Sequence, residues 1–210
     1  MIRVAHVRDT FLRGTETFIY DIVTRHRTAD AHIFCERRDH ADQFPAKNIR
    51  CIADSGALFA AAQELARKTV GYFPIYTHWA RDCRADLLHA HFGPTGYFLL
   101  ETKKKLGIPL VTSFYGQDVF EVPAKPKWKR RYERLFKEGD LFLALSTDMT
   151  KDLVAAGCPA SKIKIYRLGI DLTDFAPTAR PQRTPVKILS VARMVEKKGY
   201  RIFDPGDRPP

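Results

Sequence analysis

Short apolar runs alternate with stretches of helical periodicity along most of this chain, and this alternation limits its fold more than any other feature of the sequence. Strands are expected at residues 2–7, 32–36, 49–52, 86–91, 109–114, 140–145 and 162–168. Helices are expected at residues 16–23, 56–70, 95–106 and 126–137, and from a start capped by Ser146. Because strands that alternate with helices build parallel sheets, we predict an α/β fold, a Rossmann-like doubly wound parallel sheet, over residues 1–175.

The composition fits a globular protein and favours an anionic partner. A chain of 210 residues that is 45% hydrophobic can bury a sizeable core. It carries 35 Lys and Arg against 24 Asp and Glu, a net charge of +11. Such a charge suits a nucleotide sugar, a phospholipid surface or a nucleic acid, and charge alone does not choose among them.

Cysteine usage and the N-terminus point to the cytoplasm. The cysteines, Cys35, Cys51, Cys83 and Cys158, match no metal-ligand spacing, so we expect free thiols in a reducing compartment. Charged residues occur too early in residues 1–9 for the apolar core of a signal peptide. The sequence also has no uninterrupted run of about 18 apolar residues, which a membrane-spanning helix would need. We therefore predict a cytoplasmic protein whose membrane contact, if any, is peripheral.

A loop over residues 8–15 is expected between the first strand and the first helix. Thr15 is in position to cap that helix, with Glu16 in its first turn. Gly14 allows a tight turn, which leaves backbone amides free to face an anion. Helix capping alone also explains all three residues, so the two roles stay open.

Two later strand ends carry further candidate residues. His89 and His91 lie two apart in one strand, so their side chains share a face, with His91 nearer the carboxyl end. A histidine in this place is more often a packed or hydrogen-bonded structural residue. After the next strand, Gly116 permits close backbone approach, and Asp118 can either accept hydrogen bonds from ligand hydroxyls or cap the following turn.

The most informative stretch lies near the last residues of the chain. Residues 186–191 read as a buried strand, and the loop after it places Arg193 and Lys198 five positions apart, where open α/β sheets bind ligands. A planar guanidinium fork and a compact ammonium suit a diphosphate. A solvated turn with ordinary surface charges is the alternative.

The string that holds these two cations, Ser-Val-Ala-Arg-Met-Val-Glu-Lys-Lys-Gly at residues 190–199, resembles the loop (G/A)-R-(L/M)-V-x-x-K-G. That loop opens the donor-binding domain of the retaining glycosyltransferases of family 4, which have the GT-B fold. The resemblance implies that residues 1–175 are the N-terminal, acceptor-side domain of a GT-B fold. It also implies that Arg193 and Lys198 contact the diphosphate of a nucleotide sugar.

Further strings extend the resemblance along the chain. Residues 12–19 resemble the S-E-T-F-I opening of a bacterial exopolysaccharide branch, and residues 138–177 resemble E-x-A-D…G-I-D…F-x-P. The string Asp-Leu-Leu-His-Ala-His matches D-(L/V)-(L/I)-H-x-H, which implies that His91 lies beside donor and acceptor as the catalytic residue. Tyr115 stands where many relatives have the His of an H-G-x-D loop, so we assign it a hydrogen bond and no acid–base role. The implied substrate-binding residues are Gly14, Glu16, Tyr115, Gly116, Asp118 and Ser146.

The function that the resemblance implies is glycosyl transfer from a nucleotide sugar to a polysaccharide or lipid-linked saccharide, with retention at the anomeric carbon. The sequence has no Asp-x-Asp motif, so we expect no metal and no cofactor besides the donor substrate; the two cations would stabilise the departing diphosphate. Two alternatives stay open. One is a basic nucleic-acid binder, although no recognised motif is present and we expect no nucleic-acid partner. The other is a non-catalytic sugar- or nucleotide-binding fragment of the same fold.

The expected helix at residues 126–137 is basic and interleaved with aromatic residues. It can lie on an anionic membrane, an option that the family's lipid-linked acceptors favour, or be a surface helix whose Tyr132, Leu135 and Phe136 pack inward. The residues expected to face a membrane are Lys125, Lys127, Trp128, Lys129, Arg130 and Arg131.

The last part of the chain is expected to hold a linker and a truncated second domain. Residues 176–185 have linker composition, and residues 186–210 correspond only to the first strand and loop of a donor domain. Pro205 and Pro209 oppose a sustained helix there. We therefore expect that these 210 residues do not complete the transfer alone.

Overall fold

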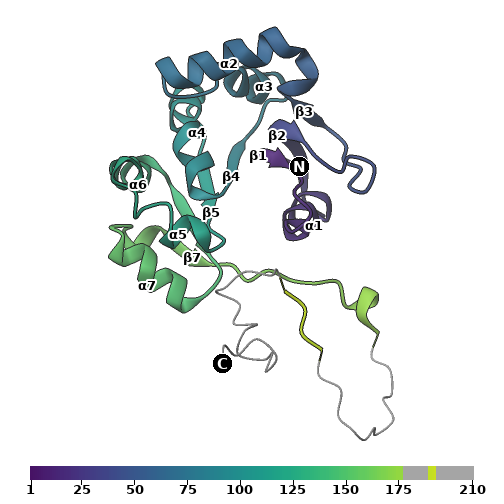
Figure 1. Ribbon diagram of the computed structural model, residues 1–210, viewed down its shortest axis with the longest axis vertical. Coiled ribbons are helices and arrows are strands. Elements are labelled where there is room, and N and C mark those ends of the chain that lie inside the picture. The colour runs from purple at the N-terminus through teal and green to yellow at the C-terminus, as the bar shows by residue number, and fades with distance from the viewer. Residues whose placement is uncertain (177–188, 193–210) are drawn as a thin grey trace, which may run out of the picture. The chain divides into compact units, whose positions relative to one another are not determined.

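The computed structural model of the chain describes residues 1–176 and 189–192, and its centre is one parallel sheet (Figure 1). The strands are β1 (Ile2–Phe11), β2 (Ala29–Arg38), β3 (Ile49–Cys51), β4 (Leu87–His91), β5 (Leu110–Ser113), β6 (Leu141–Ala144) and β7 (Ile163–Ile165). They lie in the order β3-β2-β1-β4-β5-β6-β7, and each neighbouring pair is parallel. The predicted α/β, Rossmann-like doubly wound fold is confirmed.

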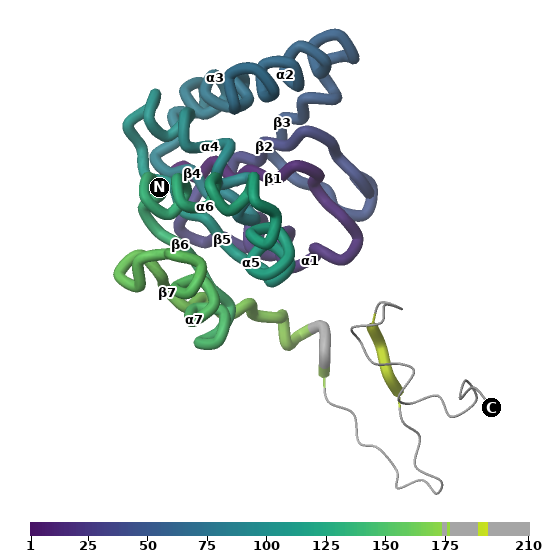
Figure 2. The backbone as a smooth tube through the Cα atoms, turned by 60° about the vertical axis from the view of Figure 1, so that its left-hand side comes forward, coloured from purple at the N-terminus to yellow at the C-terminus, as the bar shows by residue number. Residues whose placement is uncertain are grey.

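Helices cover both faces of this sheet. They are α1 (Thr17–Thr24), α2 (Ala57–Thr69), α3 (Pro74–Asp82), α4 (Gly93–Leu106), α5 (Gln117–Phe120), α6 (Pro126–Glu138) and α7 (Thr147–Ala155). On one face, α1 buries Ile19 against Ile33 of β2. On the other face, residues of α3, α4 and α6 pack around Leu88 of β4 in the larger core. The strands lie between α1 and the pair α4 and α6 (Figure 1), and α2 lies beside α3 (Figure 2).

The order of the strands creates a switch point beside β1. The chain steps from β1 to β2 and β3 in one direction, and then returns to place β4 on the other side of β1. The connections that leave β1 and β4 therefore diverge, because α1 and α4 cover opposite faces. Open α/β sheets bind ligands in the crevice that such divergence leaves at the carboxyl ends of the strands.

Strand β1 is longer than the sequence indicated. It pairs with β2 as far as Phe11, so the loop expected over residues 8–15 begins only after that residue. Arg8, which was expected to begin that loop, is 7% exposed, and Glu16 compensates its charge. Thr15 is not the cap of α1 either, since Glu16 occupies the N-cap position and no side chain caps it.

The second part of the chain is described only over a few residues. Contacts divide the chain into Met1–Ile170 and Asp171–Pro210. Of the expected strand at residues 186–191, only residues 189–191 are described, and Leu189 is 86% exposed there. Residues 177–188 and 193–210, with most of the expected linker and both Arg193 and Lys198, lie outside the described residues. The expected domain boundaries and truncation stay predictions.

Candidate functional site

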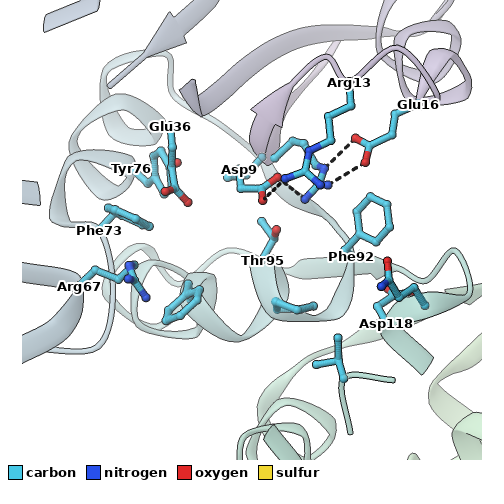
Figure 3. A pocket seen from close by; sticks show the side chains of 16 residues that line it. Asp9, Arg13, Glu16, Glu36, Arg67, Phe73, Tyr76, Phe92, Thr95 and Asp118 are labelled. Atoms are coloured by element: carbon cyan, nitrogen blue, oxygen red, sulfur yellow. Dashed lines mark hydrogen bonds and ion pairs between the residues drawn. The ribbon is translucent and has the colours of Figure 1, made fainter. Parts of the chain in front are cut away.

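A cavity of about 270 Å³ opens at the carboxyl edge of the sheet, where the connections that leave β1 and β4 diverge (Figure 3). The ends of β1 and β2, helix α3 and the start of α4 contribute to its wall. The lining residues include Arg8, Asp9, Glu16, Glu36, Arg67, Phe73, Tyr76, Phe92, Thr95, Phe98 and Asp118. Concave sites with aromatic walls and a few convergent polar groups are typical of ligand pockets.

An ion pair across the β1–α1 loop forms one side of this cavity. Arg8 Nε and Nη2 donate to Glu16 Oε2 and Oε1 at 3.0 and 2.8 Å, and Arg8 also pairs with Asp9. The Arg8 guanidinium lies 4.1 Å from the ring centre of Phe92. The two paired side chains are 8% and 9% exposed. Glu16, which was expected to bind substrate, is thus engaged by Arg8, and the pair fixes the loop that shapes the cavity.

Of the expected substrate-binding residues, Gly14, Tyr115, Gly116 and Ser146 are absent from the described cavity wall. Gly14 is exposed in the loop before α1. Ser146 caps α7, since its Oγ accepts a hydrogen bond from the Met149 backbone nitrogen at 3.1 Å. The predicted cap at Ser146 is confirmed, and contact of these residues with a substrate stays a prediction.

Asp118 organises the loop after β5. Its Oδ1 accepts hydrogen bonds from the backbone nitrogens of Tyr115 and Gly116, both at 3.0 Å, and its Oδ2 accepts one from Gly93 at 3.1 Å. Gly116 has φ +128°, which glycine adopts most readily. Burial raises the pKa of Asp118, and these hydrogen bonds oppose the shift. Both carboxylate oxygens are therefore used within the protein, which favours the turn-capping alternative for Asp118.

His91 lies in a buried group of imidazoles on the face of the sheet that α1 covers. The rings of His6, His89 and His91 have centres 4.6 to 5.4 Å apart. His91 Nε2 is 3.2 Å from His6 Nδ1, and His91 Nδ1 is 2.8 Å from the Tyr115 hydroxyl. Burial lowers the pKa of His89 to about 4 and holds the pKa of His6 and His91 well below 6.5, so all three are neutral at pH 7.

Both ring nitrogens of His91 are thus engaged, and its ring is absent from the cavity wall. This is the geometry of the packed, hydrogen-bonded alternative, so the catalytic role of His91 stays a prediction.

The same three histidines are a possible metal-ligand set. One ring nitrogen from each lies within 4.8 Å of the others, and imidazole is a common ligand of zinc. A metal held by His6 and His91 would have to replace the hydrogen bond that joins them, since both nitrogens of each ring already have partners. The described geometry fits a hydrogen-bonded group better than a metal centre.

The far wall of the cavity holds three polar residues that the sequence did not single out. The Tyr76 hydroxyl is buried without a hydrogen-bond partner in the described part of the chain. Burial, helped by the charge of Asp9, raises the pKa of Glu36 to about 7. Arg67 lies 5.2 Å from the ring centre of Phe98. Figure 3 shows Arg67 with Glu36 and Tyr76 among the residues that line the cavity. Glu36 could have been identified from the sequence, since it lies near the carboxyl end of an expected strand. Tyr76 could not, because it lies in a helix that was not expected.

Sequence comparison identifies relatives of this chain. The model of Glycosyltransferase Family 4 matches residues 12–174. "Putative colanic acid biosynthesis glycosyltransferase WcaL" of Escherichia coli (strain K12) is 37% identical over 123 residues, 57% of this chain and 30% of that protein. Amylovoran biosynthesis glycosyltransferase AmsK of Erwinia amylovora is 39% identical over 121 residues, 56% of this chain and 30% of that protein. The matched part therefore spans less than a third of each relative.

Solved structures share the fold. HepE of Anabaena, in complex with UDP and glucose, matches with a TM-score of 0.62 and 16% identity over 82% of this chain and 46% of HepE. The lipopolysaccharide outer core galactosyltransferase WaaB, in its apo form, matches with a TM-score of 0.53 and 14% identity over 78% of this chain and 44% of WaaB. These likenesses support the predicted GT-B type of fold. Since the family model covers well over half of its residues, the chain belongs to Glycosyltransferase Family 4.

Proposed function

We propose that residues 1–170 form the acceptor-side domain of a glycosyltransferase that moves a sugar from a nucleotide sugar to a polysaccharide or lipid-linked saccharide. One observation carries the proposal: the cavity at the switch point of this family 4 domain is lined by Tyr76, whose buried hydroxyl has no hydrogen-bond partner among the described residues. The names of the WcaL and AmsK relatives support a role in exopolysaccharide synthesis. The UDP and glucose held by HepE support a nucleotide-sugar donor.

The chemistry of the cavity suits a sugar ring. A pyranose has apolar C–H faces and a rim of hydroxyl groups, so it needs aromatic surfaces next to hydrogen-bonding groups. Phe73 and Phe98 provide rings, and Glu36 and Tyr76 provide an acceptor and a hydroxyl close to them. The Tyr76 hydroxyl gains a first hydrogen bond when a ligand hydroxyl reaches it, and a buried polar group without a partner is costly.

The donor half of the reaction rests on the resemblance of residues 190–199. We infer that Arg193 and Lys198 bind the donor diphosphate and stabilise its charge as it departs, in place of a metal ion. Retention at the anomeric carbon, and the position of His91 beside the reacting groups, belong to the same proposal. No cofactor is required, because the nucleotide sugar is itself the substrate.

Two substitutions in the cavity wall test saccharide binding by the chain. At pH 8, above the pKa of Glu36, Tyr76→Phe should weaken binding of a cavity-bound monosaccharide about 3- to 10-fold, and Glu36→Gln about 10-fold or more, because a charged acceptor makes the stronger hydrogen bond. Tyr76→Phe should leave the free energy of unfolding nearly unchanged, since the described structure gives its hydroxyl no hydrogen bond to lose. Saturation-transfer NMR with glucose, galactose, N-acetylglucosamine and glucuronate measures the binding.

Tyr20→Phe is the matched control, since the Tyr20 hydroxyl bonds the Pro45 carbonyl and does not line this cavity. It should leave saccharide binding unchanged. If none of the four sugars binds the folded chain, or if binding survives both cavity substitutions, the assignment of this cavity to the acceptor is wrong.

Helix α6 has the inward packing of an ordinary surface helix and also an exposed basic face. Tyr132, Leu135 and Phe136 are each at most 1% exposed. Trp128 is half-buried, and the Arg131 guanidinium lies 4.7 Å from its ring centre, so these two residues are partly engaged within the protein. The residues that remain exposed are Lys125, Lys127, Lys129 and Arg130. No helix within residues 1–176 or 189–192 has the length and hydrophobicity to cross a bilayer.

We propose that this basic face holds the protein at the cytoplasmic surface of a membrane. Each basic residue near an anionic surface contributes about 1 kcal/mol, so the double substitution Lys127→Glu with Lys129→Glu should lower binding to phosphatidylserine vesicles by at least about tenfold. Lys68→Glu with Lys151→Glu makes the same charge change at exposed lysines of α2 and α7 and should have a smaller effect. Equal co-sedimentation with pure phosphatidylcholine vesicles would argue against electrostatic attachment.

A further inference from the structure

Four side chains form a continuous hydrogen-bonded chain from the surface to the carboxyl edge of the sheet. His26 Nε2 is 3.2 Å from His6 Nε2, His6 Nδ1 is 3.2 Å from His91 Nε2, and His91 Nδ1 is 2.8 Å from the Tyr115 hydroxyl. His26 is exposed and lines a second cavity, of about 370 Å³, beside α1. Tyr115 lies two residues after the end of β5. We call His26, His6, His91 and Tyr115 the imidazole chain.

The chemistry of neutral imidazole makes this chain directional. A neutral ring has one N–H donor and one bare nitrogen acceptor, so the direction of one hydrogen bond fixes the direction of the next. His6 and His91 use both ring nitrogens, and burial keeps both rings neutral. The hydrogen bonds of the imidazole chain can therefore be arranged in only two self-consistent ways.

In the first state every hydrogen bond points toward the surface. Tyr115 donates to His91 Nδ1, His91 Nε2–H donates to His6 Nδ1, and His6 Nε2–H donates to His26. In the second state every hydrogen bond points toward the sheet edge. His26 Nε2–H donates to His6 Nε2, His6 Nδ1–H to His91 Nε2, and His91 Nδ1–H to the Tyr115 oxygen. The Tyr115 O–H then donates to another group, either the Ser113 side chain or a ligand.

We propose that the imidazole chain couples the surface residue His26 to the hydrogen-bonding role of the Tyr115 hydroxyl. A group bound at the surface that makes His26 donate to His6 favours the second state, in which the Tyr115 O–H points away from His91. A group that makes His26 accept from His6 favours the first state, in which the Tyr115 O–H donates to His91 and its oxygen can only accept from a ligand. His26 and His6 are thus positioning residues for His91 and Tyr115. Only the identification of a sugar as the ligand of Tyr115 rests on the proposed function.

His89 stands beside this chain without forming a link in it. Its Nε2 is 2.8 Å from the Ser113 hydroxyl. Ser113 also interacts with the Tyr115 side chain, so His89 meets the imidazole chain only at its Tyr115 end. The tautomers of His6 and His91 are set by the three hydrogen bonds that join the four members. A divalent metal between His6 and His91 would remove the central hydrogen and break the coupling.

The coupling is tested with the 210-residue chain itself and without any substrate. Long-range ¹H–¹⁵N NMR identifies which nitrogen of each imidazole carries hydrogen. In the wild-type protein, His6 and His91 should carry it on the same-named nitrogen, both Nε2 in the first state or both Nδ1 in the second. Hydrogen on Nδ1 of one ring and Nε2 of the other would overturn the proposal, as would a stoichiometric metal ion in the purified protein.

Two substitutions of opposite charge at His26 should then select one or the other hydrogen-bond direction in the imidazole chain. A lysine ammonium can only donate and a glutamate can only accept at pH 7.5, so His26→Lys should place hydrogen on Nδ1 of His91 and His26→Glu should place it on Nε2. His78→Lys and His78→Glu make the same charge changes at another exposed histidine and should leave His91 unchanged. Amide spectra verify that each variant is folded. The same His91 tautomer in both His26 variants would overturn the proposal, whereas a failure of saccharide binding alone would leave it standing.

Discussion

Mild acidification should destabilise this protein before most of its carboxylates titrate. Between pH 7.5 and 5.5 each of the buried imidazoles His6, His89 and His91 stays neutral in the folded state, because burial lowers its pKa, but takes up a proton on unfolding. Since the folded pKa lies below the unfolded value of 6.5, stability is fully present above pH 6.5 and is lost as the pH falls. One pH unit below that value costs about 1.4 kcal/mol per imidazole, about 4 kcal/mol for all three.

Glu36 acts in the opposite direction. Its pKa is raised by burial to about 7, so it takes up a proton in the folded state as the pH falls and returns about 2 kcal/mol over the same range. The wild-type protein should therefore lose about 2 kcal/mol, and Glu36→Gln about 4 kcal/mol. Urea unfolding at pH 7.5, 6.5 and 5.5, followed by circular dichroism, measures both slopes. His78→Gln, at an exposed histidine, should leave the slope unchanged; a flat profile in Glu36→Gln would contradict the burial of neutral imidazoles.

Replacing His91 by alanine should lower turnover much more than donor binding. In a form of the protein that continues through a complete donor domain, we expect kcat to fall about 10²- to 10³-fold, the usual effect of losing one positioned hydrogen-bonding group at a reacting centre. The donor Kd should change little, because the proposed diphosphate contacts belong to Arg193 and Lys198. Single-turnover kinetics and donor titration separate the two quantities.

His89→Gln is the matched control for this substitution. His89 is also buried on β4, but its Nε2 bonds Ser113 and its ring lies outside the hydrogen bonds that link His91 to Tyr115. We expect a small change in kcat, once both variants have been shown to be folded. Unchanged turnover in His91→Ala would rule out the role that the family resemblance gives this residue.

Features that depend on neighbouring residues could be predicted from the sequence. Strands β4, β5 and β6 lie within two residues of their expected bounds, because buried parallel strands are short apolar runs between turn residues. The cap formed by Ser146 was also expected, since a serine before a helix has one preferred partner, a backbone N–H two or three residues ahead.

Contacts between distant residues could not be predicted in this way. His6 and His91 are 85 positions apart, and only the pairing of β1 with β4 places them side by side. Arg8 was assigned to a loop, although it is buried. A lone charge is rarely buried, and the partner that permits its burial, Glu16, lies on the far side of a turn. That the Tyr76 hydroxyl has no hydrogen-bond partner in the described part of the chain is a property of packing around the cavity, which no local pattern encodes.

Sugar transfer itself is tested most directly by one measurement on a form of the protein that contains a complete donor domain. The protein is incubated with radiolabelled nucleotide sugars, a polysaccharide or lipid-linked saccharide and EDTA, and the label in the acceptor is counted. We predict that label enters the acceptor in the presence of the chelator, with the anomeric configuration of the donor retained. Label that stays in the nucleotide sugar, or leaves only as free sugar with every acceptor offered, would contradict the proposed function.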